Sequence, residues 1–432
     1  MAVLFDKVTV VTMDEKDTVL KDAYVLVDGG KITYVGTETP KDFQGERIGG
    51  ARKVLMPGLV NMHTHVPMTV LRGFADGYEL HTWLNEHIFP AEAKFDASLV
   101  ETSTNLGLAE MIASGTVAIN EMYDFADTIC GCVDKAGINM NITRATTLFD
   151  GAFDPKTHKG AREAVELYEK WHGHDDGRIR VDMGIHAEYT SSPPLWEWTA
   201  GFAKDHGLGL HIHVSETQKE HEECIARHGL TPIKALAKYG LLDRPLAAAH
   251  CVWISDTDMT LMQERGATAV HNPVSNMTLA SGFARLTDIM AAGVNVALGT
   301  DSVASNNSHD MFEEIKAAAM IHKGAMRNPV VITAEEALRM ATANGAKAQG
   351  RGDRSGQVKV GFDADLIMLD FDKPHLQPCW SATSNIVFAA RGSDVVMNMV
   401  RGEIIYKNGE HLRIDVEKTI AEIGPALDKI RR

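Results

Sequence analysis

Short runs of alternating apolar and polar residues lie near both ends of the chain, and this period-two pattern is typical of β-strands. The first 56 residues contain three such runs, and Asp28-Gly29-Gly30 supplies a turn between two of them. Three more runs follow residue 360, with turns at Arg401-Gly402 and Asn408-Gly409. We therefore expect residues 1–56 and 360–432 to form one small β-sandwich.

The segment between them, residues 57–359, alternates short β-rich runs with stretches of helical periodicity, such as residues 99–113, 161–171 and 231–239. Eight strands are predicted, at residues 59–63, 117–122, 139–143, 180–185, 209–213, 247–250, 267–271 and 295–299. Eight strand–helix units predict an α/β protein whose catalytic domain is a (β/α)8 TIM-like barrel. A doubly wound open sheet is the alternative.

Polar residues that can bind a metal or transfer protons lie where several of these strands end. They include His63, His213, His250 and, just past the last strand, Asp301. A closed barrel brings the carboxyl ends of all its strands to one face, whereas an open sheet spreads them out. The distribution of these residues over four strands therefore favours the barrel.

A candidate metal site begins with His63 and His65, because side chains two residues apart on a strand share a face. With His213 and Asp301 they form a three-His, one-Asp set, which suits one zinc or ferrous ion with water in the remaining position. Any one of these histidines taken alone is more often a core or turn residue. His211 is expected to be a hydrogen-bonded core histidine. The predicted fourth strand has no lysine, which argues against a second metal bridged by a modified lysine.

Two further residues are candidates for proton transfer. Glu216 follows His213 by three residues, where a carboxylate can carry protons without being a ligand. Its alternative role is as a helix-cap partner of Ser215 or Thr217. His250 follows three alanines and can orient an attacking water or stabilise negative charge. Its alternative role is that of a structural histidine.

Composition and charge narrow the class of protein. Hydrophobic residues make up 44% and charged residues 23%, as in an ordinary soluble enzyme, and the net charge of -15 disfavours nucleic acid and anionic membranes as partners. We find no signal-peptide pattern and no apolar run near the roughly 18 residues of a membrane span. Five scattered cysteines indicate reduced thiols. We expect a cytoplasmic enzyme with a small-molecule substrate, assembled as a homo-oligomer.

Several motifs occur at defined places along the chain. They are residues 57–65 (PGLVNMHTH), 67–73 (PMTVLRG), 83–84 (WL) with 90–92 (PAE), 271–276 (HNPVSN), 299–301 (GTD) and 304–307 (ASNN). The first resembles the opening metal motif of the amidohydrolase superfamily. Together they are similar to the 5-methylthioadenosine/S-adenosylhomocysteine deaminases, essentially end to end. Chlorohydrolases and guanine deaminases share parts of the adenosine-directed motifs.

The resemblance implies a metal-dependent deaminase with one divalent ion per chain, zinc or iron. The metal ligands implied are His63, His65, His213 and Asp301. Glu216 and Asp301 would move protons while His250 contacts the attacking water. This matches the zinc deaminases in which a glutamate that is not a ligand acts as acid and base.

The resemblance also implies substrate contacts. Glu92 would hold the ribose hydroxyls, His186 would contact the purine ring, and Arg144 would face the amino-acid tail of S-adenosylhomocysteine. Glu216 and Asp301 would also contact the reacting end of the substrate. The implied reaction is the deamination of 5′-deoxyadenosine, 5′-methylthioadenosine, S-adenosylhomocysteine or adenosine.

Three positions depart from the family pattern. Glu188 stands where the family usually has proline, and Thr278 where it usually has lysine. A second family arginine, expected near residues 155–162, has no counterpart, since Arg162 is out of register. This favours neutral 5′ substituents. The alternatives are an amidohydrolase acting on another heterocycle (chlorotriazine, guanine or pterin) and a catalytically silent scaffold.

Overall fold

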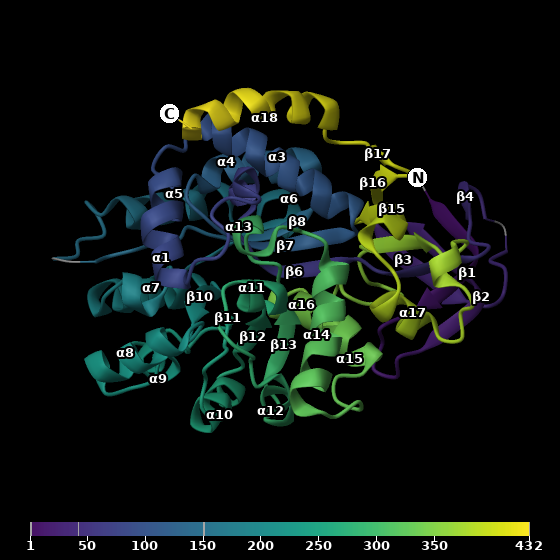
Figure 1. Cartoon of the computed structure of the whole chain (residues 1–432). Coiled ribbons are helices and arrows are strands. Elements are labelled where there is room, and N and C mark those ends of the chain that lie inside the picture. The colour runs from purple at the N-terminus through teal and green to yellow at the C-terminus, as the bar shows by residue number, and fades with distance from the viewer. Residues whose placement is uncertain (1, 42, 150–151, 432) are drawn as a thin grey trace.

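Two four-stranded parallel sheets occupy the middle of the chain in the computed structural model, which describes residues 2–41, 43–149 and 152–431 (Figure 1). The first sheet has the order β6 (Leu59–Thr64), β7 (Thr116–Met122), β8 (Asn139–Thr143), β9 (Ile179–Asp182). The second has the order β10 (Leu210–Val214), β11 (Leu246–His250), β12 (Thr268–His271), β13 (Asn295–Leu298). All eight lie where the sequence predicted strands, and every pairing within the two sheets is parallel.

The edges of the two sheets lie beside each other. Parallel bridges pair Met183, just past β9, with Leu210 of β10, and Thr64 of β6 with Asp301, just past β13. The carboxyl ends of the first and last strands are therefore neighbours, and the histidines of β6 lie beside the aspartate that follows β13.

Helices follow most strands and surround the two sheets in Figure 1. The predicted helices are confirmed as α3 (Ala97–Ala113), α5 (Lys159–Trp171) and α9 (Pro232–Lys238). The others around the sheets are α4 (Ala126–Ala136), α7 (Pro193–His206), α8 (Gln218–His228), α10 (Asp256–Glu264), α12 (Leu286–Ala291), α14 (Met311–Met326), α15 (Ala334–Met340) and α16 (Ala343–Ala348).

Short helical segments lie between the strand ends and the long helices. They are a 3-10 helix over Val66–Leu71, α1 (Leu80–Thr82), a π-helical stretch over Trp83–Ile88, α2 (Phe89–Glu92), α6 (His174–Gly177), a 3-10 helix over Glu188–Thr190, α11 (Pro273–Thr278) and α13 (Val303–Asn306). One of these segments carries a predicted site residue, Glu92 at the end of α2.

Strands from both ends of the chain form one nine-stranded sheet, as the alternating patterns suggested. Its strands are β1 (Val3–Val11), β2 (Val19–Asp28), β3 (Lys31–Gly36), β4 (Glu46–Gly49), β5 (Lys53–Pro57), β14 (Leu366–Asp370), β15 (Val395–Val400), β16 (Glu403–Lys407) and β17 (Glu410–His411). The two ends join where β14 pairs antiparallel with β5. A separate buried cluster that includes Phe5, Val25 and Met397 forms the core of this region. The sandwich arrangement stays a prediction.

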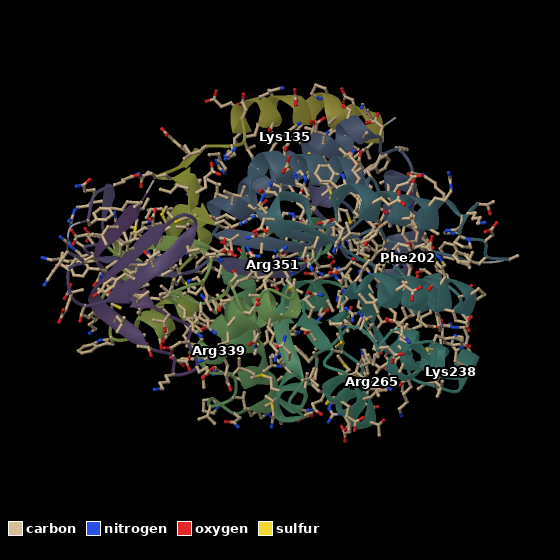
Figure 2. The ribbon with its side chains drawn as sticks, turned by 180° about the vertical axis from the view of Figure 1, so that it is seen from behind. Lys135, Phe202, Lys238, Arg265, Arg339 and Arg351 are labelled. Carbon is tan, nitrogen blue, oxygen red and sulfur yellow. The ribbon has the colours of Figure 1, made fainter. Side chains whose placement is uncertain are left out.

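Ion pairs and helix packing attach this terminal sheet to the rest of the molecule. Arg339 of α15 donates to Asp17 at 2.5 Å. Buried Arg351 lies in the segment between α16 and β14, which leads into the terminal sheet, and it donates to the backbone carbonyls of Gly177 (2.6 Å) and Arg178 (3.0 Å), just before β9. Both arginines are labelled in Figure 2. The last helix, α18 (Val416–Arg431), lies across α3 in Figure 1, and α17 (Ala382–Phe388) packs on α14 and α15.

Among the described residues, no helix has the length and apolar character needed to cross a membrane. All five cysteines are free thiols, and Cys379 is the exposed one.

Candidate functional site

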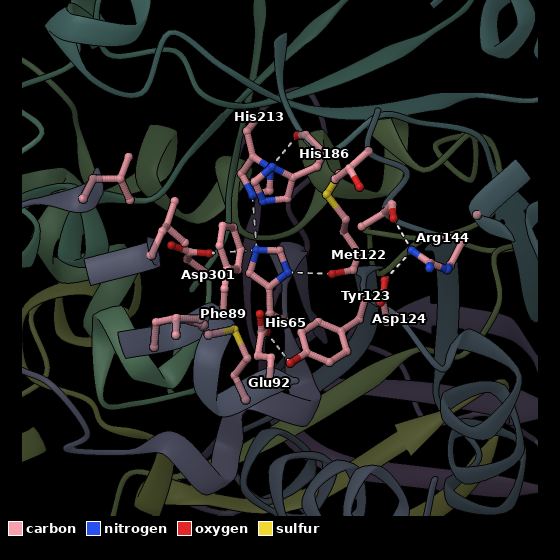
Figure 3. Close-up of a pocket in the computed structure, with 18 of the residues that line it drawn as sticks. His65, Phe89, Glu92, Met122, Tyr123, Asp124, Arg144, His186, His213 and Asp301 are labelled. Carbon is pink, nitrogen blue, oxygen red and sulfur yellow. Dashed lines mark hydrogen bonds and ion pairs between the residues drawn. The ribbon is translucent and has the colours of Figure 1, made fainter. Parts of the chain in front are cut away.

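A cavity of about 610 Å³ opens at the carboxyl ends of the parallel strands. Every predicted site residue except His63 lines it: His65, Glu92, Arg144, His186, His213, Glu216, His250 and Asp301. Figure 3 shows His65 at the centre of this group, with His213 and Asp301 beside it. The structure therefore gathers residues from distant parts of the sequence into one site.

The predicted metal ligands crowd together at the base of this site. His65 Nε2 lies 3.2 Å from His213 Nε2 and 3.3 Å from Asp301 Oδ1. His63 Nε2 lies 3.2 Å from the same aspartate oxygen. Potential ligand atoms of His63, His213, His250 and Asp301 all lie within 4.8 Å of one another. His250 thus lies within reach of the same centre as the four predicted ligands.

The other ring nitrogen of each histidine is bound by a fixed partner, as is usual for histidines that ligate metals. The Nδ1 atoms pair as follows: His65 with Met122 O at 2.6 Å, His213 with His186 O at 2.7 Å, His250 with Asn276 Oδ1 at 2.8 Å, and His63 with His211 Nε2 at 2.9 Å. Nε2 of His63 is buried and forms no hydrogen bond with any described residue. This donor set fits a divalent cation, and His211 is the hydrogen-bonded core histidine that was expected.

The two oxygens of Asp301 have different surroundings. Oδ2 accepts hydrogen bonds from Ser275 Oγ at 2.6 Å and Ser305 Oγ at 3.0 Å, whereas Oδ1 faces His63 and His65. The backbone of Asp301 has φ +63°, a left-handed conformation that is costly outside glycine and clusters at functional sites. The serines therefore fix one oxygen and leave the other for the cluster.

Electrostatics keep the Asp301 carboxylate charged. Burial alone would raise its pKa, but the imidazoles of His63 and His65 beside it hold that pKa well below its ordinary value. Burial lowers the pKa of His63 to about 3. Burial also acts to lower the pKa of His65, but its hydrogen bond with Asp301 outweighs burial and raises that pKa to about 9. The Asp301 carboxylate is therefore charged, and His65 beside it holds a proton near pH 7 that a bound metal ion would displace.

Glu216 points into the cavity instead of capping the following helix. The cap is built by Thr217, whose hydroxyl accepts from Glu220 N, and by Glu220, whose carboxylate accepts from Ser215 N and Glu216 N. The Glu216 carboxylate lies 3.8 Å from His250 Nε2. Burial raises the pKa of Glu216, and a carboxyl group with a raised pKa holds a proton more readily.

Two predicted substrate contacts, Glu92 and His186, lie in the same cavity. The Tyr123 hydroxyl donates a hydrogen bond to Glu92 Oε1, and burial raises the pKa of Glu92 to about 7. His186 Nδ1 lies 3.0 Å from Thr190 Oγ1. Burial lowers the pKa of His186 to about 4, so this imidazole is neutral near pH 7.

Arg144, the predicted contact for an amino-acid tail, already has several partners. Its Nη1 contacts the Asp124 carboxylate and donates to the Ala145 carbonyl, and its Nε donates to Glu163 Oε2 at 2.7 Å. Figure 3 shows Arg144 next to Asp124 at one side of the cavity. Two carboxylates therefore oppose the charge of this guanidinium.

Comparison with known proteins agrees with this arrangement. The chain matches the amidohydrolase family over residues 54–405. It is 41% identical, over 100% of both chains, to a 5-methylthioadenosine/S-adenosylhomocysteine deaminase of Acetivibrio thermocellus. The chain therefore belongs to the amidohydrolase family and, within it, to the family of these deaminases, which confirms the resemblance.

Two further relatives extend the comparison. A 5′-deoxyadenosine deaminase of Methanosarcina acetivorans is 40% identical over 98% of this chain and 96% of its own length. The crystal structure of an adenosine deaminase from Xanthomonas campestris with bound zinc superposes with a TM-score of 0.93 at 34% identity. That comparison covers 99% of this chain and 98% of the other.

The structure adds residues to which the sequence assigned no role. Tyr123 and Asp124 follow β7 directly and line the cavity, so their position just past a predicted strand was a usable signal. Ser275 and Asn276 lie in the HNPVSN motif, where their partners Asp301 and His250 were not apparent. Those contacts join segments that only the fold brings together.

Proposed function

We propose that the chain is a metal-dependent hydrolase that deaminates 5′-modified adenosines to the corresponding inosines and ammonia. The observation that carries this proposal is one cavity in which the His/Asp cluster, Glu216, Glu92 and His186 all meet. Full-length relatives named 5-methylthioadenosine/S-adenosylhomocysteine deaminase and 5′-deoxyadenosine deaminase support the substrate class.

We propose that the two parallel sheets close into a single (β/α)8 barrel, residues 57–359, with residues 1–56 and 360–432 as a second domain. The bridges from Met183 to Leu210 and from Thr64 to Asp301 support closure. The separate core of the terminal sheet supports the second domain. In a barrel of this kind, the carboxyl ends of the strands are where active sites lie.

One divalent ion per chain, zinc or iron, would be held by His63, His65, His213 and Asp301. Three imidazoles and a carboxylate suit either metal, and the zinc-bound adenosine deaminase supports zinc. The metal would supply the Lewis acidity that lowers the pKa of a water molecule to about 7. His250, with Nδ1 bound to Asn276, would direct its free Nε2 toward that water.

Proton movement falls to two carboxylates. Asp301 is ionised and can accept the water proton on Oδ1, since the serines occupy Oδ2. Glu216, with its raised pKa, can hold a proton and pass it to the purine ring, which helps ammonia leave from C6. Loss of either group would leave the attack without its proton acceptor or donor.

Recognition of the nucleoside falls to other residues of the cavity. Glu92 would accept hydrogen bonds from the ribose hydroxyls, and neutral His186 would contact the purine. The resemblance assigns Arg144 to an amino-acid tail, but the carboxylates of Asp124 and Glu163 already pair with its guanidinium. We therefore expect 5′-deoxyadenosine and methylthioadenosine to be at least as good substrates as S-adenosylhomocysteine.

The test is a spectrophotometric screen of adenosine, 5′-deoxyadenosine, methylthioadenosine and S-adenosylhomocysteine, which follows the ultraviolet change from adenine to hypoxanthine. Glu216→Gln should abolish turnover and keep the metal, whereas His213→Ala should lose both. Release of chloride from triazines or of ammonia from guanine, with adenosines untouched, would overturn the proposal. A homo-oligomer and a cytoplasmic location stay predictions; light scattering and fractionation test them.

A further inference from the structure

The cavity carries charged side chains that neither the cluster nor the ribose contact uses. They are Asp124, Arg144 and Lys159, and all three line the cavity. The Arg144 side chain is buried, with 9% exposed, whereas the Asp124 side chain is 53% exposed. A substituent that reaches Arg144 from the cavity therefore meets Asp124 as well.

The contacts of Arg144 occupy two of its three guanidinium nitrogens and set two carboxylates against its charge. Asp124 and the Ala145 carbonyl take up Nη1, and Glu163 takes up Nε. Lys159 Nζ lies 3.6 Å from the other oxygen of Glu163. Two cations and two carboxylates thus balance one another. An incoming carboxylate would have to displace Asp124 or lie next to it, and like charges side by side repel.

A second cavity of about 440 Å³ continues past this ion pair and shares Asp124, Phe125, Arg144 and Lys159 with the first. Its remaining charged lining is Asp127, Glu163, Glu166 and Lys170. Counted together, its lining holds four carboxylates and three cations. A long substituent that extends beyond Arg144 therefore enters surroundings with an excess of negative charge.

We propose that Asp124 determines substrate specificity by excluding adenosines whose 5′ substituent carries a net negative charge. This inference rests on the proposed function, because it assigns the 5′ substituent to the part of the cavity near Arg144. Neutral and positively charged substituents are accepted, since neither is repelled by Asp124. Arg144 acts as the partner that holds Asp124 in place, not as an anion receptor.

The experiment uses three 5′-thioethers of 5′-deoxyadenosine with tails of matched length: propyl, 2-aminoethyl and carboxymethyl. The wild-type enzyme should turn over the carboxymethyl compound with a kcat/KM about tenfold or more below the propyl compound. Asp124→Asn should lower KM for the carboxymethyl compound and so raise its kcat/KM about tenfold. The same variant should change kcat/KM for 5′-deoxyadenosine by less than about twofold, since that compound has no 5′ tail. Equal wild-type values for all three tails, or a uniform shift in Asp124→Asn, would overturn the proposal.

Matched variants separate specificity from folding. Asp127→Asn removes a carboxylate whose side chain is 64% exposed, which pairs with Lys170 and lines only the second cavity, so it should leave the tail ranking unchanged. Glu163→Gln removes the other carboxylate on Arg144 and should favour the carboxymethyl tail, as Asp124→Asn does. If Asp124→Asn fails to fold in a thermal melt, Glu163→Gln decides the question.

The outcome is distinguishable from failure of the proposed function. If adenosine and 5′-deoxyadenosine are not deaminated, the proposed function is wrong. Calorimetric Kd values of the three thioethers on the metal-loaded protein then still test whether a negatively charged 5′ substituent is excluded. Weaker binding of the carboxymethyl compound than of the other two supports the inference, and equal Kd values overturn it.

Discussion

The Tyr123 hydroxyl donates a hydrogen bond to Oε1 of Glu92, and both side chains line the cavity next to His65 (Figure 3). The two residues come from different parts of the chain, since Tyr123 follows β7 and Glu92 ends α2. Among the described residues, Tyr123 is the one hydrogen-bond donor to this carboxylate. The tyrosine therefore fixes one oxygen, and Oε2 is available for a sugar hydroxyl.

Tyr123→Phe should weaken nucleoside binding without affecting the chemistry. A hydrogen bond to a charged group contributes about 1.5–3 kcal/mol, so KM for 5′-deoxyadenosine should rise about tenfold or more. We expect kcat to stay within about twofold, because Tyr123 does not contact the reacting atoms. Steady-state kinetics provide the measurement, with Tyr239→Phe, outside the cavity, as the control. A collapse of kcat at unchanged KM would contradict this role.

The pH dependence of KM should report the protonation of Glu92. Burial raises its pKa to about 7, so the carboxyl group is ionised above that pH and protonated below it. Protonation removes an acceptor for the ribose hydroxyls, and KM should therefore rise as pH falls through about 7. KM measured from pH 5.5 to 8.5 (a range of about 1.5 units on either side) tests this. Glu92→Gln should have a flat profile over the same range; a slope that persists there must come from another group.

Ser275→Ala should test how Asp301 is oriented. Removing the 2.6 Å hydrogen bond leaves Oδ2 with Ser305 alone and lets the carboxylate rotate. Partners that orient metal ligands typically contribute about 10- to 100-fold in metal affinity or activity. We expect a loss of that size, measured as the zinc affinity in a competition titration and as kcat. Ser192→Ala, at the start of α7, is the control because its side chain forms no cap bond. Unchanged affinity and kcat would show that Ser305 suffices.

Metal content should be about one divalent ion per chain, as a three-His, one-Asp site requires. Chelation should remove the ion and the activity together, and readdition of zinc or ferrous iron should restore both. Elemental analysis by mass spectrometry gives the stoichiometry. Two tightly bound ions, both needed for activity, would contradict the mononuclear site.

The sequence was informative where a strand has a local pattern. Residues 139–143 were predicted to form a strand and form β8 with the same bounds, because Met140 and Ile142 alternate with polar residues at the period of two that is typical of strands. The fourth strand was predicted to reach residue 185, yet the ladder of β9 stops at Asp182. Beyond it, a Cβ on Gly184 would lie 2.1 Å from the His211 carbonyl oxygen. This close approach between strands depends on the partner strand, which local periodicity does not specify.

Residues that act through partners distant in sequence were not predictable. Glu216 was weighed as a helix cap, but Glu220 has that role, and only the path of the loop after β10 decides between the two. Arg144 was predicted as a tail contact from the resemblance to the deaminase family. Its pairing with Asp124 and Glu163 follows from the packing of three separate segments. Motifs identified the groups, and the fold determined their partners.

Glu92→Ala should erase the preference for ribonucleosides while the metal content stays at the wild-type level. Wild-type enzyme should deaminate 5′-deoxyadenosine far better than its 2′-deoxy analogue or free adenine, because absent hydroxyls leave Oε2 of the Glu92 carboxylate without a partner in the cavity. In Glu92→Ala that penalty disappears, so kcat/KM should fall for the ribonucleoside and change little for adenine. The ratio of kcat/KM values for the three compounds is the measurement, with elemental analysis as the control for the metal. A variant that keeps the wild-type ratio would show that another residue recognises the ribose, and a variant that loses its metal would place Glu92 in the support of the cluster.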